Sequence, residues 1–119
     1  MLPQTHCERY RALGQQLGQL QQLAEAPDAD AAELARQCQQ LEQQFQTDIM
    51  ALTDRELDPQ MGAQWQSLQT EMHRMMRLLR TDVTFLQAAR QSALRQKRQA
   101  SIRDRLARLS SYVEALLQL

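Results

Sequence analysis

Glycine and proline, the residues that most often interrupt helices, are scarce in this chain, with three of each in 119 residues. Aromatic residues make up only 4% of the sequence, and the β-branched residues that favour strands are few. Leu, Ala, Gln, Arg and Glu dominate instead, and all of them are good helix formers. We therefore expect an all-α protein whose core is built mainly from leucine, alanine and methionine. At this length one hydrophobic core is sufficient, so we expect a single domain.

Cysteine and histidine are also rare, with two of each: Cys7, Cys38, His6 and His73. Their spacing is that of no structural zinc module, although Cys and His are the ligands that zinc prefers. The cysteines are expected to be reduced thiols in the core, with a disulfide between them as the alternative. We find neither a phosphate-binding glycine loop nor a nucleophile-and-base pattern. The sequence therefore predicts no metal, no cofactor and no enzymatic activity.

Long apolar runs are missing as well. No stretch approaches the roughly 20 apolar residues needed to span a bilayer, so membrane insertion is not expected. The first ten residues, MLPQTHCERY, lack the apolar core of a signal peptide. These two observations favour a cytoplasmic protein.

The net charge is zero, but the charges are unevenly distributed. Residues 1–60 carry ten acidic and four basic side chains, whereas residues 61–119 carry ten basic and four acidic ones. Two interpretations remain open. Acidic and basic helices could pack together and neutralise each other, or the basic half could be a binding surface for a partner.

Apolar residues recur at steps of three and four along four segments, about 3–26, 30–53, 59–90 and 92–118, which predicts four helices. Pro3 suits the first turn of the first segment. Asp28 or Asp30 can cap the second, with Glu33 completing a capping box. The pair Asp58-Pro59 marks the start of the third, and Ser92 is expected to cap the fourth.

Four long segments with short connections favour an antiparallel up-and-down four-helix bundle. The main alternative is a two-helix hairpin that folds only as a dimer. Spare apolar width on the third segment also allows a homodimer of folded bundles.

The third segment has the broadest apolar face. Trp65, Leu79 and Leu86 lie along one stripe, and Met75, Asp82 and Phe85 lie along a second stripe about 100° away. We expect this helix to contact two or three others, with Trp65, Phe85 and Leu86 as structural residues. Asp82 is the discordant residue, because a buried carboxylate needs a partner. A salt bridge to an arginine of the fourth helix, or a position at the rim of the core, would supply one.

Two clusters could bind other molecules. The first is basic and is predicted to bind a partner: Arg77, Arg80, Arg90, Arg95, Lys97, Arg98, Arg103 and Arg105. It could face solvent, an acidic protein or nucleic acid, although nucleic-acid binding is not expected because no aromatic residue or recognisable module accompanies it. The second cluster, Met72, Met75 and Met76, could form a groove for an amphipathic helix of a client protein, or simply be core.

Three stretches carry a family resemblance: MRLLRTDVTFLQAARQ (76–91), RQKRQASIRDRLARLSSYVEALL (95–117) and PQTHCERYRAL (3–13). Together they resemble the cyanobacterial heterocyst frequency control protein PatD family. The resemblance spans most of the chain, and the second half carries its specificity.

This resemblance implies a non-enzymatic cytoplasmic regulator that binds the tubulin-like division protein FtsZ. Such a protein would modulate FtsZ assembly and, in filamentous species, heterocyst frequency. FtsZ is generally acidic, so a basic surface would complement its charge. The alternatives are a helical chaperone or adaptor for a client protein, and a weak nucleic-acid-binding protein.

Overall fold

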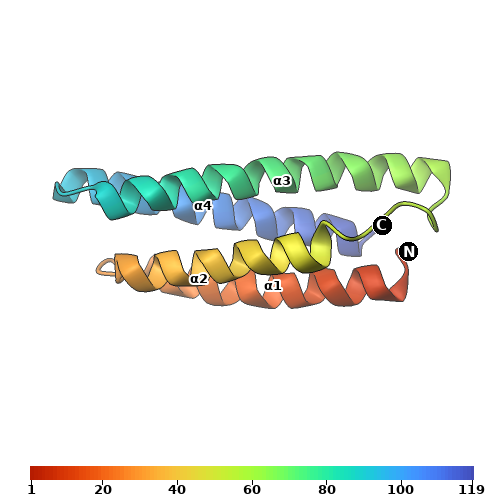
Figure 1. The fold of residues 1–119 in the computed structure, drawn as a ribbon, viewed down its shortest axis with the longest axis horizontal. Coiled ribbons are helices and arrows are strands. Elements are labelled where there is room, and N and C mark those ends of the chain that lie inside the picture. The colour runs from red at the N-terminus through yellow and green to blue at the C-terminus, as the bar shows by residue number, and fades with distance from the viewer.

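The computed structural model describes all 119 residues as helices joined by short connections. The helices are α1 (Gln4–Glu25), α2 (Ala31–Gln44), α3 (Pro59–Ala88) and α4 (Ser92–Leu117), and a π-helical turn, η1 (Phe45–Ile49), extends α2. Successive helices run in opposite directions along a molecule of 50 × 21 × 19 Å (Figure 1). The all-α antiparallel four-helix bundle expected from the sequence is confirmed.

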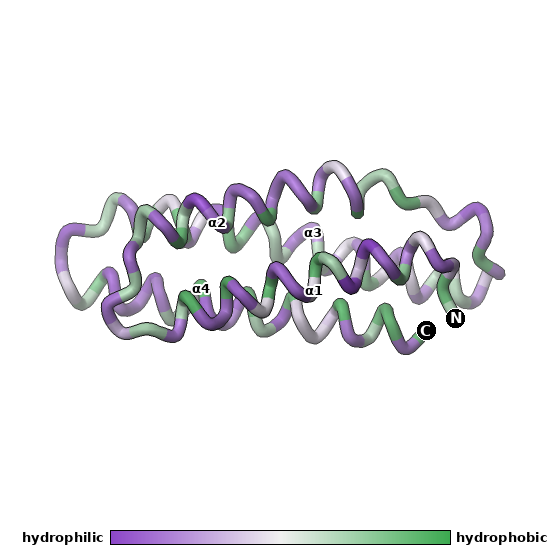
Figure 2. The backbone as a smooth tube through the Cα atoms, turned by 90° about the horizontal axis from the view of Figure 1, so that it is seen from below, coloured by the Kyte–Doolittle hydropathy of each residue, from purple (hydrophilic) through white to green (hydrophobic).

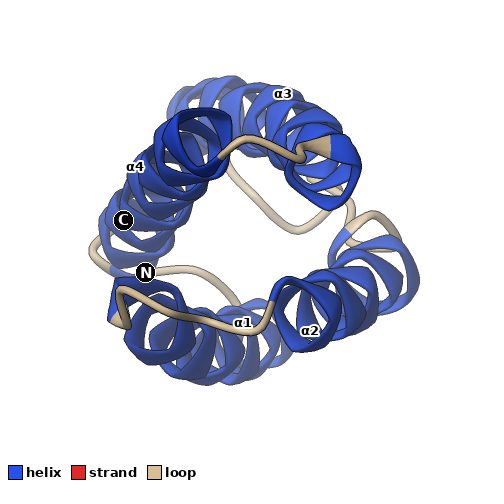
Figure 3. Ribbon diagram, turned by 90° about the vertical axis from the view of Figure 1, so that its left-hand side faces the viewer, coloured by secondary structure: helices blue, strands red, loops and turns tan.

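Seen along its long axis, the bundle is a ring in which α1, α2, α3 and α4 follow one another (Figure 3). Helix α3 therefore packs against two neighbours, α2 and α4, and α1 closes the ring against α4. The loops 26–30 and 89–91 lie at one end of the bundle, and both termini lie toward the other end (Figure 1). The molecule thus consists of two hairpins, α1–α2 and α3–α4, whose loops share one end.

Each helix buries one side. A cluster of 24 buried apolar residues runs through the bundle, and hydrophilic and hydrophobic segments alternate along every helix (Figure 2). Trp65 and Leu86 belong to this cluster as expected, and so do all three methionines of the predicted client groove, Met72, Met75 and Met76. The methionine stripe is therefore mainly part of the core, and only Met76 also borders the groove between α2 and α3. No helix combines the length and apolar character needed to cross a bilayer.

Two of the predicted helix starts are confirmed. The Asp30 carboxylate accepts hydrogen bonds from the backbone N–H groups of Ala32 and Glu33, at 2.9 and 3.4 Å. Asp58 accepts one from Met61 N at 2.9 Å, with Pro59 as the first helical residue. Each carboxylate thus satisfies N–H groups that have no partner within the helix. Glu33 does not complete a capping box, because its carboxylate bonds to Arg36 and lies on the helix surface.

The predicted cap of the fourth helix is wrong. Gln91 occupies the capping position without a side-chain hydrogen bond, and Ser92 is already the first helical residue. A side chain of α4 stabilises the connection between α3 and α4 instead, because Arg95 Nε donates to the carbonyl oxygen of Ala89 at 3.0 Å. An arginine of α4 therefore satisfies a carbonyl at the end of α3.

The second helix also ends earlier than predicted. Its regular part stops at Gln44, whereas the sequence predicts a helix to residue 53. In the turn that follows, Met50 N donates to Phe45 O, five residues back, at 3.0 Å. Side chains from other helices take the carbonyl groups freed there: Arg9 bonds to Asp48 O at 2.9 Å, and Gln69 to Ile49 O at 3.4 Å. The π-turn keeps Phe45 and Ile49 fully buried while the chain turns away from the bundle.

A chain of polar groups crosses the core near the termini. Trp65 Nε1 donates to the Tyr10 hydroxyl at 2.8 Å, and that hydroxyl donates to Gln69 Oε1 at 2.6 Å. His6 lies edge-on to Trp65, and its Nε2 donates to the carbonyl oxygen of Thr53 at 2.9 Å. The other ring nitrogen of His6, Nδ1, is buried without a hydrogen-bond partner. These bonds fix how α1, α3 and the segment after η1 meet.

Two buried groups should make the fold sensitive to alkali. Burial raises the pKa of Tyr10, and it raises the pKa of the Cys38 thiol from 9.0 to about 12. The folded state therefore keeps both protons to higher pH than the unfolded chain does, and this contribution to stability is lost as pH rises above about 9. We expect the midpoint of thermal unfolding, followed by circular dichroism, to fall steadily between pH 9 and pH 11. Cys38→Ala should flatten this decline, and an unchanged decline in that variant would contradict the assignment to Cys38.

Candidate functional site

The most strongly charged part of the chain is the loop end of the α3–α4 hairpin. Between residues 72 and 103 there are eight basic side chains and one acidic side chain, Asp82. This range covers the second half of α3, the connection, and the first half of α4. The predicted basic cluster is therefore brought together by the fold, except for Arg105, which lies just beyond this range. Its members have different roles, however.

Two of the arginines are structural because they neutralise Asp82. That carboxylate is 4% exposed, and it accepts from Arg98 Nη1 at 3.3 Å and from Arg105 Nε at 3.0 Å. Arg98 and Arg105 lie seven residues apart, two turns of α4, and so on the same side of it. The salt bridge predicted between Asp82 and the fourth helix is confirmed, with two partners instead of one. Neither arginine is free to pair fully with another molecule.

Arg103 joins the two hairpins. Its Nη1 donates to the carbonyl oxygen of Ala24 at 3.2 Å, close to the C-terminal end of α1. Gln99, one turn earlier on α4, donates to Ala24 O at 2.9 Å and to Ala26 O at 2.6 Å. Carbonyl groups at a helix C-terminus carry partial negative charge, which an arginine compensates. Arg103 thus has a capping role within the bundle, and its binding to a partner stays a prediction.

Arg80 and Arg95 are engaged in other ways. Arg80 Nη1 pairs with Glu42 of α2 at 2.9 Å, and Arg95 bonds to the backbone beyond α3 as described above. The pair between Arg80 and Glu42 is the one salt bridge that connects residues 1–60 with residues 61–119. Direct pairing between the acidic and basic halves is therefore limited to this one salt bridge.

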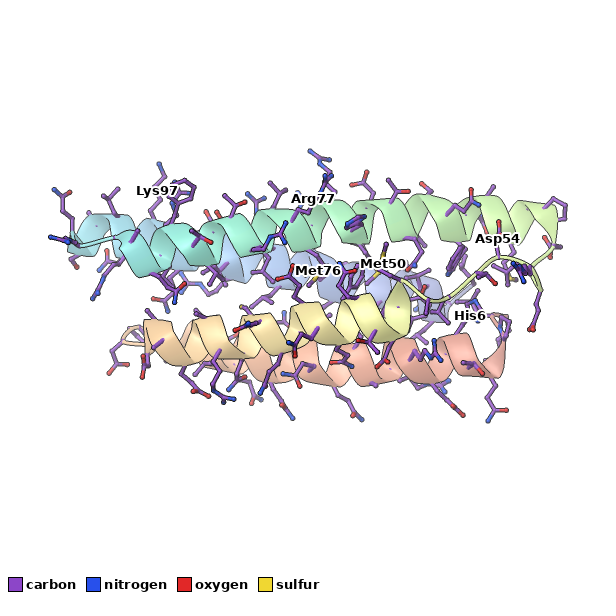
Figure 4. The ribbon with its side chains drawn as sticks, in the orientation of Figure 1. His6, Met50, Asp54, Met76, Arg77 and Lys97 are labelled. Carbon is purple, nitrogen blue, oxygen red and sulfur yellow. The ribbon has the colours of Figure 1, made fainter.

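Three members of the predicted cluster remain unpaired. Arg77, Arg90 and Lys97 are exposed and make no salt bridge or side-chain hydrogen bond. Arg77 and Lys97 lie on the outer side of the α3–α4 hairpin, away from α1 and α2 (Figure 4). These three residues are called the free cations below. They are the part of the cluster whose charge is fully available to a partner.

The placement of Phe85 differs from the prediction. The ring was expected in the core, but it is 49% exposed, and the Arg98 guanidinium carbon lies 4.4 Å from its centroid. A cation over an aromatic face is attracted to the ring quadrupole. Phe85 lies on the stripe that the helical wheel indicated, at the outer edge of the interface between α3 and α4, where α4 covers only part of the ring.

Leu94 was not predicted as a site residue, yet it is 47% exposed on the first turn of α4. The sequence does contain a signal for it. Leu94 is the only large apolar residue among the polar and basic residues that open this helix. An isolated leucine there has no core to enter, so its exposure could have been inferred.

The grooves of the molecule contain less distinctive chemistry. One of about 410 Å³ lies between α2 and α3, with alanines and the Cys38 side chain among its lining residues. A second, of about 660 Å³, lies between the two loops at the shared end. Neither is lined by a histidine, and no group of three His, Cys, Asp or Glu side chains is arranged to hold a metal ion. Cys7 and Cys38 are both buried free thiols.

Comparison with known proteins adds no constraint on these roles. No protein-family model matches the chain, and no match is found among curated proteins or among solved structures.

Proposed function

We propose that this protein is a non-enzymatic cytoplasmic regulator of the PatD type, which binds FtsZ through the α3–α4 hairpin and modulates its assembly. In a filamentous cyanobacterium it would thereby affect cell division and heterocyst frequency. The family assignment rests on the resemblance of residues 76–91 and 95–117 described above. The partner is then an acidic protein, and a surface of opposite charge is the complement that such a partner requires.

The free cations are the observation that carries the proposal. Five of the eight predicted contact residues are held by intramolecular bonds, whereas Arg77, Arg90 and Lys97 are not. Binding an acidic partner at these three positions breaks no contact within the bundle. Arginine and lysine at a rim also accelerate encounter with a partner of opposite charge, and this effect weakens as salt rises.

The proposal is tested by sedimenting FtsZ polymers, formed with GTP, in the presence of the purified protein. We expect the protein to co-sediment with the polymer and to change its mass or bundling. The double variant Arg90→Glu, Lys97→Glu should bind about tenfold more weakly at low salt, because each lost or reversed surface pair is worth roughly 0.7 kcal/mol.

The matched control is Arg11→Glu, Arg55→Glu, which makes the same change in net charge with two exposed arginines of the acidic half. It should bind like the unmodified protein. Equal weakening by both double variants would show a nonspecific charge effect, and absence of co-sedimentation at low salt would refute FtsZ as the partner. Arg98 is left intact in these variants, because its removal would take away one of the two salt-bridge partners of the buried Asp82.

A further inference from the structure

Two of the four large apolar side chains that are exposed lie at the loop end of the α3–α4 hairpin. Phe85 is 49% exposed and Leu94 is 47% exposed, whereas Met1 and Met50 belong to other parts of the molecule. Isolated exposed apolar residues are common on protein surfaces. This pair is different because a charged side chain on the same side of α4 as Leu94 lies over the Phe85 ring.

Arg98 is that side chain. Its guanidinium covers one face of the Phe85 ring at 4.4 Å and pairs with the buried Asp82 at 3.3 Å. Leu94 precedes Arg98 by one helical turn, which places the two on the same side of α4 about 6 Å apart. Asp82 thus anchors Arg98, and Arg98 holds the Phe85 ring on the side of α4 that also carries Leu94.

The charge around this apolar pair is positive and uncompensated. Arg90 and Lys97 flank it along the connection and the first turns of α4, and neither has an intramolecular partner. The one acidic residue of the hairpin end, Asp82, is buried and already shared by two arginines. A ligand that covers Phe85 and Leu94 therefore meets cations at the rim and no exposed carboxylate between residues 72 and 103.

We propose that Phe85 and Leu94 form a docking surface for an acidic peptide segment that carries a large apolar side chain. The apolar side chain packs on Phe85 and Leu94, and the acidic groups beside it pair with Arg90 and Lys97. This inference rests on the proposed function, since it names the chemistry by which the hairpin would hold its partner. Arg98 acts as a positioning residue, because it orders the ring while its charge is shared with Asp82.

Two other occupants fit the charges less well. A second copy of the chain in a two-fold dimer would place the same cations opposite one another, which is repulsive. An anionic membrane would approach the end of the bundle, but the loop between α1 and α2 carries the exposed Asp28 and Asp30 at that end. A peptide can bind to the α3–α4 side alone and avoid these carboxylates.

The test uses the full-length protein and two fluorescein-labelled synthetic peptides of equal length, with the same number of Asp residues. One peptide carries Leu and Trp between the acidic residues, and the other carries Ser at those positions. By fluorescence anisotropy, we expect the apolar peptide to bind about tenfold more tightly than the serine peptide. The double variant Phe85→Ala, Leu94→Ala should reduce this preference to less than twofold and leave a weak, salt-sensitive binding of both peptides.

Met50→Ala is the matched control, because Met50 is exposed to a similar degree in another part of the molecule. It should keep the full preference. The preference for the apolar peptide is also measured for the single variant Leu94→Ser, which changes only an exposed residue in the first turn of α4. Circular dichroism verifies that each variant is folded. An equal preference in the unmodified protein and the double variant, or no preference in either, overturns the inference.

The remaining outcomes separate this inference from the proposed function. FtsZ binding that is unaffected by Phe85→Ala, Leu94→Ala contradicts the docking surface and leaves the function standing. A preference for the apolar peptide without any FtsZ binding supports the docking surface and contradicts the proposed function. Two further results would assign the surface to another occupant if the peptide preference is absent. Sedimentation with phosphatidylserine vesicles that depends on Phe85 and Leu94 would indicate a membrane. A concentration-dependent dimer that depends on the same two residues would indicate a second copy of the chain.

Discussion

Asp82→Ala is expected to lower the free energy of unfolding by about 3 kcal/mol, which is the low end of the range for breaking a buried ion pair. The carboxylate is 4% exposed and serves two arginines, so its removal leaves two guanidinium groups beside the core without a counter-charge. Both arginine side chains are about one third exposed and can turn partly into water, which limits the loss. In a chain of this size the change corresponds to a fall of about 10 °C in the midpoint of thermal unfolding.

The control for this prediction is Asp104→Ala, which removes an exposed carboxylate of α4 that has no salt bridge. Its effect should stay within about 0.5 kcal/mol. A triple variant is also informative: Asp82→Leu, Arg98→Met, Arg105→Met replaces the whole charged group by apolar side chains. It should recover most of the lost stability, because a buried ion group is seldom better than well-packed apolar residues. An Asp82→Ala protein as stable as the original would show that Asp82 is not needed to hold the arginines.

Phe45→Ala is expected to cost about 3–5 kcal/mol, the usual range for truncating a fully buried aromatic side chain. Phe45 is 0% exposed, begins the π-turn after α2, and lies with its ring centroid 6.2 Å from that of His73 on α3. The cavity left there would be lined by a rigid helix end that cannot collapse into it, because Arg9 and Gln69 hold the neighbouring carbonyl groups.

The matched comparison is Phe85→Ala, the same substitution at a ring that is 49% exposed. It should cost less than about 1 kcal/mol, because little apolar area leaves the core and the cation–π contact is worth about 0.5–1 kcal/mol at an exposed site. Urea unfolding of both variants, analysed with a common slope, measures the difference. Equal destabilisation would mean that Phe85 is packed in the core in solution, which would also remove the basis of the docking surface.

Much of the architecture follows from local sequence features. Asp58-Pro59 and Asp30 start their helices through hydrogen bonds that span three residues or fewer, so they can be recognised in the sequence alone. The partners of Asp82 could be narrowed to the fourth helix, because a carboxylate inside an apolar stripe needs a nearby cation. The end of α2 could not be predicted in this way, since it depends on Arg9 and Gln69, which are remote in sequence.

The basic cluster, too, could be predicted from the sequence only in part. The sequence predicts that cations gather on the third and fourth helices, but helical spacing does not reveal which of them meet a carboxylate or a helix end. Arg103 reaches the end of α1, 79 residues away along the chain. The sequence predicts the correct stripe for Phe85 but wrongly predicts that its ring is buried. Helical spacing gives the direction in which a side chain points, but it does not show how much of that side chain the neighbouring helix covers. Leu94 and the free cations therefore emerge as a surface only in the folded bundle.

This distinction changes which substitutions are informative. Reversing Arg95, Lys97 and Arg98 together would combine a free cation with a residue that closes a helix connection and one that neutralises a buried carboxylate. Loss of binding in such a variant could arise from loss of structure. Substitutions restricted to Arg77, Arg90 and Lys97 avoid this ambiguity, because these side chains make no contact that the fold requires.

The most direct measurement of the central claim is a titration of labelled FtsZ with the unmodified protein and with Arg77→Glu, Arg90→Glu, Lys97→Glu, at 50 mM and 300 mM salt. We expect saturable binding of the unmodified protein that weakens at the higher salt, and binding by the triple variant that is at least tenfold weaker at the lower salt, with unfolding midpoints that agree within about 2 °C. Binding of equal strength by both proteins at 50 mM salt would contradict the assignment of the partner surface to the free cations of the α3–α4 hairpin.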